Sequence, residues 1–242
     1  MSLFARLGWS WKDRYMLNAT IRADESSKFA PGHRWGYFPS VSAGWTISEE
    51  DFMKSTKGWL DFLKLRASWG QVGNANINCY QYLAPVTTSN TNYNFGTQAG
   101  QTGWSTGSYP SRLANENVKW ETSEQFNVGI DARFIQSRLS LTADWYIKTT
   151  KDWLVQAPVL ATAGTQGPVI NGGDVKNTGI ELGLTWNDNI GKDFSYSVGG
   201  NFAYNHNEVG SIPTEDGIIH GATNQIYSNA EESSTVPRTA TP

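Results

Sequence analysis

The stretch LSLTADWYI, residues 139–147, alternates strictly between two kinds of side chain. Its odd-numbered positions are apolar: Leu139, Leu141, Ala143, Trp145 and Ile147. The positions between them carry hydroxyl, carboxyl or phenol groups. Because successive side chains of a β-strand point to opposite faces, this period of two predicts a strand with one apolar face and one polar face.

Further runs of the chain repeat this period, with apolar alternate positions within residues 3–11, 15–23, 41–47, 63–69, 126–134, 180–186 and 194–204. None of these positions is charged, although 17% of all residues are. A cationic side chain facing lipid at mid-bilayer costs about 2–4 kcal/mol, so the exclusion favours a face in contact with lipid. The opposite faces carry the charges, including Arg6, Arg66, Asp131 and Asp144.

The connections between these runs fall into two classes. Those at KDR, IQSR and NDNIGKD are short, whereas residues 24–39, 71–120 and 150–178 form long ones. Bacterial outer-membrane barrels have short periplasmic turns and long extracellular loops. Under this topology two aromatic belts result, one near the periplasmic ends that includes Trp11 and Trp45, and one near the outer ends that includes Trp145.

One periplasmic connection, SEEDFMKSTKGW, is longer than the others. Ser48 is suited to cap a helix, Glu49 to Asp51 would favour its dipole, and Gly58 would end it. We therefore expect one short periplasmic helix.

Composition excludes several other functions. The formal charge of −3 and the absence of a basic stripe argue against nucleic-acid binding. His33, His206 and His220 lack metal-ligand spacing, and the single Cys79 is expected to be inert packing. Hydrolase, phosphate-loop and zinc-protease motifs are missing. We expect no catalytic residue, no cofactor and no metal, and therefore not an enzyme.

The longest loop contains aromatic side chains among Asn, Gln, Ser, Thr and Gly. Such mixtures suit contact with sugars or peptides, although they also occur in ordinary exposed loops. The candidate ligand contacts are Tyr93, Phe95, Trp104 and Tyr109.

Several long motifs, in the same order, resemble the SusC/RagA-type TonB-dependent transporters of the Bacteroidota outer membrane. They are RYMLNATIRADESSKF, RWGYFPSVSAGWTISEEDFM, LDFLKLRASWGQVGN, VKWETSEQFNVGIDARF, RLSLTADWYIKTTKDWL and VKNTGIELGLTWN. The resemblance covers roughly residues 3–231. The tail SSTVPRTATP departs from the pattern.

The resemblance implies an all-β fold: an antiparallel transmembrane β-barrel fragment of about 8–10 strands from a large barrel with long outer loops. The plug and the C-terminal strands of that family are not expected in this chain. We assign residues 1–231 to a partial barrel and residues 232–242 to a disordered, non-family tail. A second possibility is that eight strands close into a small barrel of their own.

The implied function is part of an outer-membrane importer of glycan oligomers or peptides. Its implied partners are a SusD-like lipoprotein, the TonB complex acting through a missing N-terminal region, the substrate and the lipid bilayer. The alternatives are a soluble, aromatic-rich β-sandwich that binds carbohydrate and an enzyme of β-helical or propeller type. For the enzyme the sequence offers no convergent acid, base or metal set.

Overall fold

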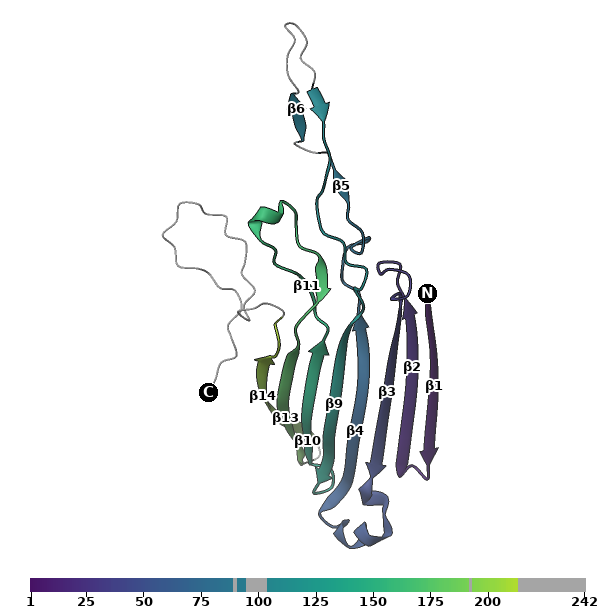
Figure 1. Cartoon of the computed structure of the whole chain (residues 1–242). Coiled ribbons are helices and arrows are strands. Elements are labelled where there is room, and N and C mark those ends of the chain that lie inside the picture. Colours follow the sequence, from purple (N-terminus) through teal and green to yellow (C-terminus); the bar gives the residue numbers. More distant parts are fainter. Residues whose placement is uncertain (89–90, 95–103, 192, 213–242) are drawn as a thin grey trace, which may run out of the picture.

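The computed structural model describes residues 1–88, 91–94, 104–191 and 193–212. Its main element is an eight-stranded antiparallel sheet. The strands of this sheet lie side by side in the order in which they occur along the chain. Its strands are β1 (Ser2–Trp11), β2 (Tyr15–Glu25), β3 (Trp35–Thr46), β4 (Leu60–Asn74), β9 (Glu121–Phe134), β10 (Leu139–Lys151), β13 (Val175–Ile190) and β14 (Phe194–Val209). Figure 1 shows these strands as one curved layer, with tight turns at one end and the long connections at the other.

The eight alternating runs predicted from sequence are all confirmed as strands of this sheet. Their register aligns the predicted apolar positions in rows across the layer. One such row runs through Leu7, Ala19, Val41, Trp69, Phe126 and Ile147. Because each row continues onto the next strand on the same side, the sheet has a continuous apolar face and a continuous polar face.

The long strands extend further toward the outer loops than the hydropathy pattern indicates. β4 continues to Asn74 and β9 begins at Glu121, so both reach beyond the predicted residues 63–69 and 126–134. Polar residues such as Gln71 and Glu124 continue the period of two on the otherwise apolar face. At the outer ends of β4 and β9 the hydropathy pattern therefore no longer marks a strand, although the backbones of the two strands remain paired.

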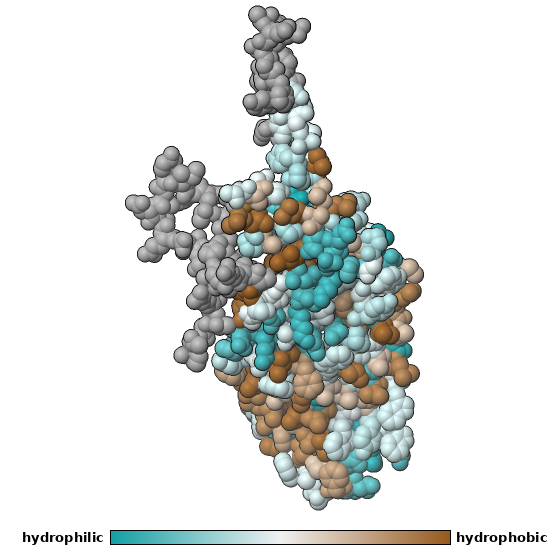
Figure 2. Space-filling model, in the orientation of Figure 1, coloured by the Kyte–Doolittle hydropathy of each residue, from teal (hydrophilic) through white to brown (hydrophobic). Residues whose placement is uncertain are grey.

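Most of the apolar face is uncovered in this chain. Ile180 is 45% exposed, Leu184 49% and Phe202 60%. Among the described residues the remaining sheets are two-stranded, so none of them could cover this face as the second layer of a sandwich would. Figure 2 shows hydrophobic side chains gathered over the lower part of the large sheet and hydrophilic ones above them, toward the loops.

The large sheet is open. Within the described part of the chain, β1 pairs with β2 alone and β14 with β13 alone. This arrangement does not support the closed eight-stranded barrel, and it fits a wall segment of a wider one.

The few fully enclosed apolar residues lie at the two ends of the sheet. Phe29, Phe38 and Val118 are buried where the outer loops meet, and Leu60 and Ala132 are buried near the tight turns. The outer loops also contain small ladders and one turn of helix. These are β5 (Val86–Thr87) with β8 (Tyr109–Pro110), β6 (Asn92–Asn94) with β7 (Trp104–Thr106), β11 (Leu154–Gln156) with β12 (Val169–Asn171), and η3 (Ala161–Ala163).

The expected periplasmic helix takes a different form. The connection contains two 3₁₀ helices, η1 (Ile47–Glu49) and η2 (Asp51–Thr56), and Ser48 does not cap either of them. Ser48 lies inside η1, and its Oγ is buried without a hydrogen-bond partner among the described residues. The helix is interrupted at Glu50, which adopts an extended conformation with φ −77° and ψ 148°.

Candidate functional site

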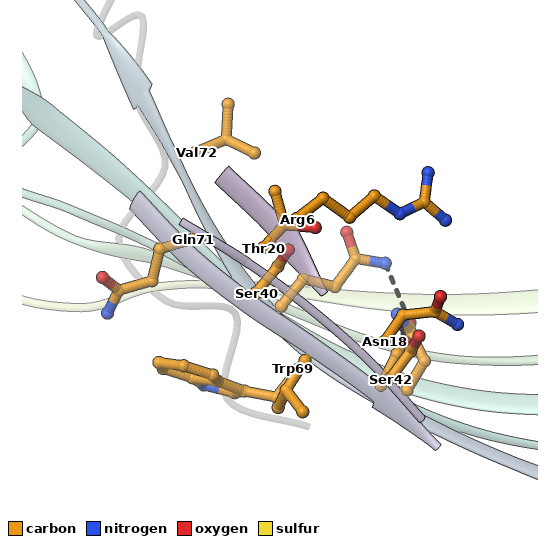
Figure 3. Close-up of a pocket in the computed structure, with 13 residues that line it drawn as sticks. Arg6, Asn18, Thr20, Ser40, Ser42, Trp69, Gln71 and Val72 are labelled. Atoms are coloured by element: carbon orange, nitrogen blue, oxygen red, sulfur yellow. Dashed lines mark hydrogen bonds between the residues drawn. The ribbon is translucent and has the colours of Figure 1, made fainter. Parts of the chain in front are cut away.

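A cavity of about 460 Å³, drawn in Figure 3, lies near the outer end of the large sheet, mainly on its polar face, and its lining also includes Val41 and Trp69 from the apolar row. Its floor is built from short hydroxyl and amide side chains on adjacent strands: Thr20, Ser40, Ser42, Ser68 and Asn127. Asn127 accepts a hydrogen bond of 2.8 Å from Gln125 Nε2 and donates one of 3.2 Å to Ser68 Oγ. Arg6 is the only charged residue among the described residues of the lining. The cavity is therefore suited to neutral, hydrogen-bonding ligands.

Below this cavity the polar face carries a charged cluster of Arg66, Asp131 and Asp144. The Arg66 guanidinium lies 2.7 Å from Asp131 across the β4–β9 pair and 3.1 Å from Asp144 on β10. Arg66, Gly129 and Asp144 occupy one row of the sheet, so the second contact passes directly over Gly129. The cluster ties three strands together on the polar face.

Gly129 is required by this arrangement. A Cβ atom built there would overlap the Asp144 carboxylate and lie 2.9 Å from Arg66 Nη2. We expect Gly129→Val to separate Arg66 from Asp144 and to lower the free energy of unfolding by about 1–3 kcal/mol, since a charge-assisted hydrogen bond is lost. Thermal unfolding of the full-length protein in detergent measures this.

Gly183→Val is the matched control, because Gly183 also lies on the polar face and a Cβ atom at that position would have only Thr142 nearby, at 3.9 Å, among the described residues. Equal destabilisation by both substitutions would show that the cost comes from valine in a strand and not from the charged cluster.

At the periplasmic end, the Glu50 carboxylate joins β2, β3 and the turn between β1 and β2. Oε1 accepts hydrogen bonds from the Tyr15 hydroxyl at 2.5 Å and from Trp45 Nε1 at 3.1 Å, and Oε2 lies 3.3 Å from Arg14. The Tyr15 ring stacks between those of Trp11 and Trp45, which are three of the side chains assigned to the predicted aromatic belt at this end. These contacts hold Glu50 in its extended conformation and explain why the two 3₁₀ helices do not join.

The hydrogen bond from Tyr15, then that from Trp45, holds the pKa of Glu50 below its ordinary value. A lowered pKa in the folded state stabilises the fold above the pKa of the unfolded carboxyl, and this contribution is lost as the pH falls through the folded value. We therefore expect Glu50→Gln to reduce the melting temperature at pH 7 and to have a progressively smaller effect at acidic pH. Glu49→Gln, at an exposed neighbouring position, is the control; a pH-independent effect of Glu50→Gln would contradict this assignment.

The outer loops are fastened together by an aromatic cluster. The Trp120 ring lies 5.3 Å from that of Phe29 and 5.5 Å from that of Phe38, and its Nε1 donates a 2.9 Å hydrogen bond to the Arg34 carbonyl. Lys28 Nζ donates to the Ala75 carbonyl at 3.0 Å. The loop of residues 26–34 is thus attached to the connections that follow β4 and precede β9.

Three of the four sequence-predicted ligand contacts lie on an arm that projects beyond these loops in Figure 1. Tyr93 lies in β6 and Trp104 in the paired strand β7, where it is opposite Asn94. Tyr109 lies in β8 opposite Thr87 and is 42% exposed. Phe95 lies outside the described residues. The backbone therefore brings Tyr93, Trp104 and Tyr109 onto one arm, and their role in binding stays a prediction.

Sequence reasoning did not identify the charged cluster or the Glu50 contacts as groups. Arg66, Asp131 and Asp144 were each assigned to the polar face, but their proximity depends on the register of three strands. In the described part of the chain, no group of three or more His, Cys, Asp or Glu residues is placed to hold a metal ion. None of the described helices has the length and apolar character to cross a bilayer.

The structure is a single curved sheet with an uncharged apolar band on one face and a polar opposite face. Tight turns lie at one end of the sheet and long loops at the other, and together these features define a class of protein. The chain is a wall segment of an outer-membrane β-barrel. Comparison with known proteins gives the particular family: residues 1–238 match the family model described as TonB dependent receptor-like, beta-barrel. The chain belongs to this family, and within it to the SusC and RagA type.

Two curated relatives are 37% identical to the chain. TonB-dependent receptor P39 of Formosa agariphila matches over 91% of this chain and 20% of its own length. TonB-dependent receptor SusC of Bacteroides thetaiotaomicron matches over 89% of this chain and 21% of its own length. The chain thus spans about a fifth of the length of these relatives.

The solved structure of the RagAB peptide transporter is 31% identical, with a TM-score of 0.74, over 88% of this chain and 22% of its own. The RagAB peptide importer in its open-open state gives a TM-score of 0.76 at 30% identity, with the same coverage of both chains. These matches confirm the predicted fold class and the outer-membrane location.

Proposed function

We propose that the chain forms part of a TonB-dependent importer that takes up glycan oligomers or peptides across the outer membrane. The observation that carries this proposal is the two-faced sheet: its apolar face is free of charge through the band suited to lipid, and its polar face holds most of a cavity of about 460 Å³. In this function the sheet supplies lipid-facing wall and polar lumen surface, and it performs no bond chemistry.

The partners follow from the same proposal. A SusD-like lipoprotein would cover the outer loops, and the TonB complex would supply the energy for import. RagAB, a relative of known structure, is a peptide transporter, which supports peptides as one substrate class. The first contacts with substrate would be made by Tyr93, Trp104 and Tyr109 on the outer arm, and by Phe95.

Import is tested with the full-length transporter expressed in a strain lacking it. We expect the protein in the outer-membrane fraction, with an electrophoretic mobility that changes on heating, and uptake of labelled oligomers that stops when TonB is removed. Recovery of the protein as a soluble periplasmic species, or uptake that does not depend on TonB, would reject the proposal.

A further inference from the structure

A second polar cavity, of about 430 Å³, lies among the outer loops. Four segments that are distant in sequence form its walls: the loop after β2, the segments that follow β4 and β8, and the β11–β12 hairpin. Its lining is rich in side-chain amides, from Asn76, Asn78, Gln81, Gln156 and Gln166. Its volume lies in the range of small-ligand pockets.

Two cationic side chains, Lys28 and Arg112, line this cavity. Lys28 Nζ donates to the Ala75 carbonyl at 3.0 Å, and Arg112 Nη2 donates to the carbonyls of Tyr80 at 3.2 Å and Leu83 at 3.4 Å. Neither cation forms an ion pair with any described residue, and no Asp or Glu is among the described residues of the lining. Arg112 Nε is buried without a hydrogen-bond partner in the described part of the chain. The described lining therefore carries two cationic side chains and no carboxylate of its own, although the Glu121 carboxylate accepts a 3.2 Å hydrogen bond from the backbone of Leu154 in the wall.

Part of the backbone around the cavity is paired within the wall itself. Gln166 donates to the Ser111 carbonyl and accepts from Leu113 N, while Ala157 N donates to the Pro168 carbonyl. β11 and β12 pair only with each other among the described strands, so the side chains of the wall, and not its backbone, distinguish a sugar from a peptide as the ligand. The wall presents carboxamides, each of which donates and accepts hydrogen bonds as sugar hydroxyls do.

We propose that this cavity binds uronic acid residues of an acidic oligosaccharide. Lys28 and Arg112 would bind the sugar carboxylate, because charge-assisted hydrogen bonds to a carboxylate are the strongest available to them. The amides of Asn76, Asn78 and Gln81 would bind the ring hydroxyls. This inference rests on the proposed import function, since it selects one substrate class at the outer loops of the importer.

The test is calorimetric titration of the full-length transporter in detergent with tetragalacturonate, with maltotetraose as the neutral sugar and tetraglutamate as the acidic peptide. We expect tetragalacturonate to bind more tightly than either, and its affinity to fall with added salt. Lys28→Gln removes one charge, and Asn78→Asp places a like charge beside the ligand at an exposed position of nearly equal shape. Each is expected to weaken binding by about tenfold or more.

Lys176→Gln is the matched control, because Lys176 is exposed on β13 and does not line the cavity. Its affinity for tetragalacturonate should equal that of the unmodified protein. Equal or tighter binding of either other tetramer, no binding of tetragalacturonate, or unchanged affinity in both cavity variants would overturn the inference. TonB-dependent uptake of neutral glycans or peptides by the same protein would then leave the proposed function standing.

Discussion

Replacing Phe29 by alanine is expected to release the outer loops while the barrel wall stays folded. The Phe29 side chain is fully buried, and its ring packs against Trp120, which in turn contacts Phe38. Truncating a buried phenylalanine typically costs about 3–5 kcal/mol, as transfer energy and an unfilled cavity add together. Here the loss is concentrated in residues 26–34 and 115–120, because the long strands keep their own backbone pairing.

Hydrogen exchange of the full-length protein in detergent measures this release. Amide protection should fall in the two loop segments and remain unchanged in β9 and β10. Tyr37→Ala is the control, since Tyr37 lies nearby on β3 and is 63% exposed. Global loss of protection would mean that the aromatic cluster stabilises the wall itself, whereas full retention would mean that other contacts hold the loops.

The second large effect is expected from Ala143→Arg. Ala143 lies midway along the apolar positions of β10, where it pairs with Ile130 on one side and Leu182 on the other. If this face meets lipid, an arginine there lies near the bilayer midplane and costs about 2–4 kcal/mol. We expect the free energy of unfolding in lipid vesicles, measured with urea, to fall by this amount. The yield of folded, heat-modifiable barrel should fall with it.

Thr142→Arg provides the comparison on the opposite face of the same strand. Thr142 is exposed and pairs with Asp131, so an arginine there has water and a carboxylate nearby. A similar cost for both substitutions would contradict the assignment of one face to lipid and the other to the lumen.

The strands and the direction of their faces could be predicted from sequence because a barrel wall is a repetitive environment. Every row of the sheet contacts lipid on one side and polar surroundings on the other, so each strand carries the same period of two. The tight turn between Trp11 and Tyr15 likewise follows from the abrupt end of two alternating runs. Strand ends near the loops were predicted less well, since residues such as Gln71 and Glu124 place polar side chains on the otherwise apolar face.

The periplasmic connection shows where local reasoning fails. Ser48 and the acids after it have the composition of a helix start, yet Glu50 accepts hydrogen bonds from Tyr15 and Trp45 and stays extended. The energy of these contacts, which include one with a strand far away in the sequence, outweighs a weak local helix preference. The same explanation applies to the cavity of Lys28 and Arg112, whose four wall segments have no common sequence signal.

The sequence by itself determined the eight strands, the faces of each strand and the family, because these depend on neighbours two residues apart and on motifs in linear order. Only the tertiary structure decided which side chains meet: Arg66 with Asp131 and Asp144, Glu50 with Tyr15, and Phe29 with Trp120. These side-chain contacts depend on strand register and on the paths of long loops. Both are fixed by the sum of many weak contacts across the sheet and not by any single local pattern.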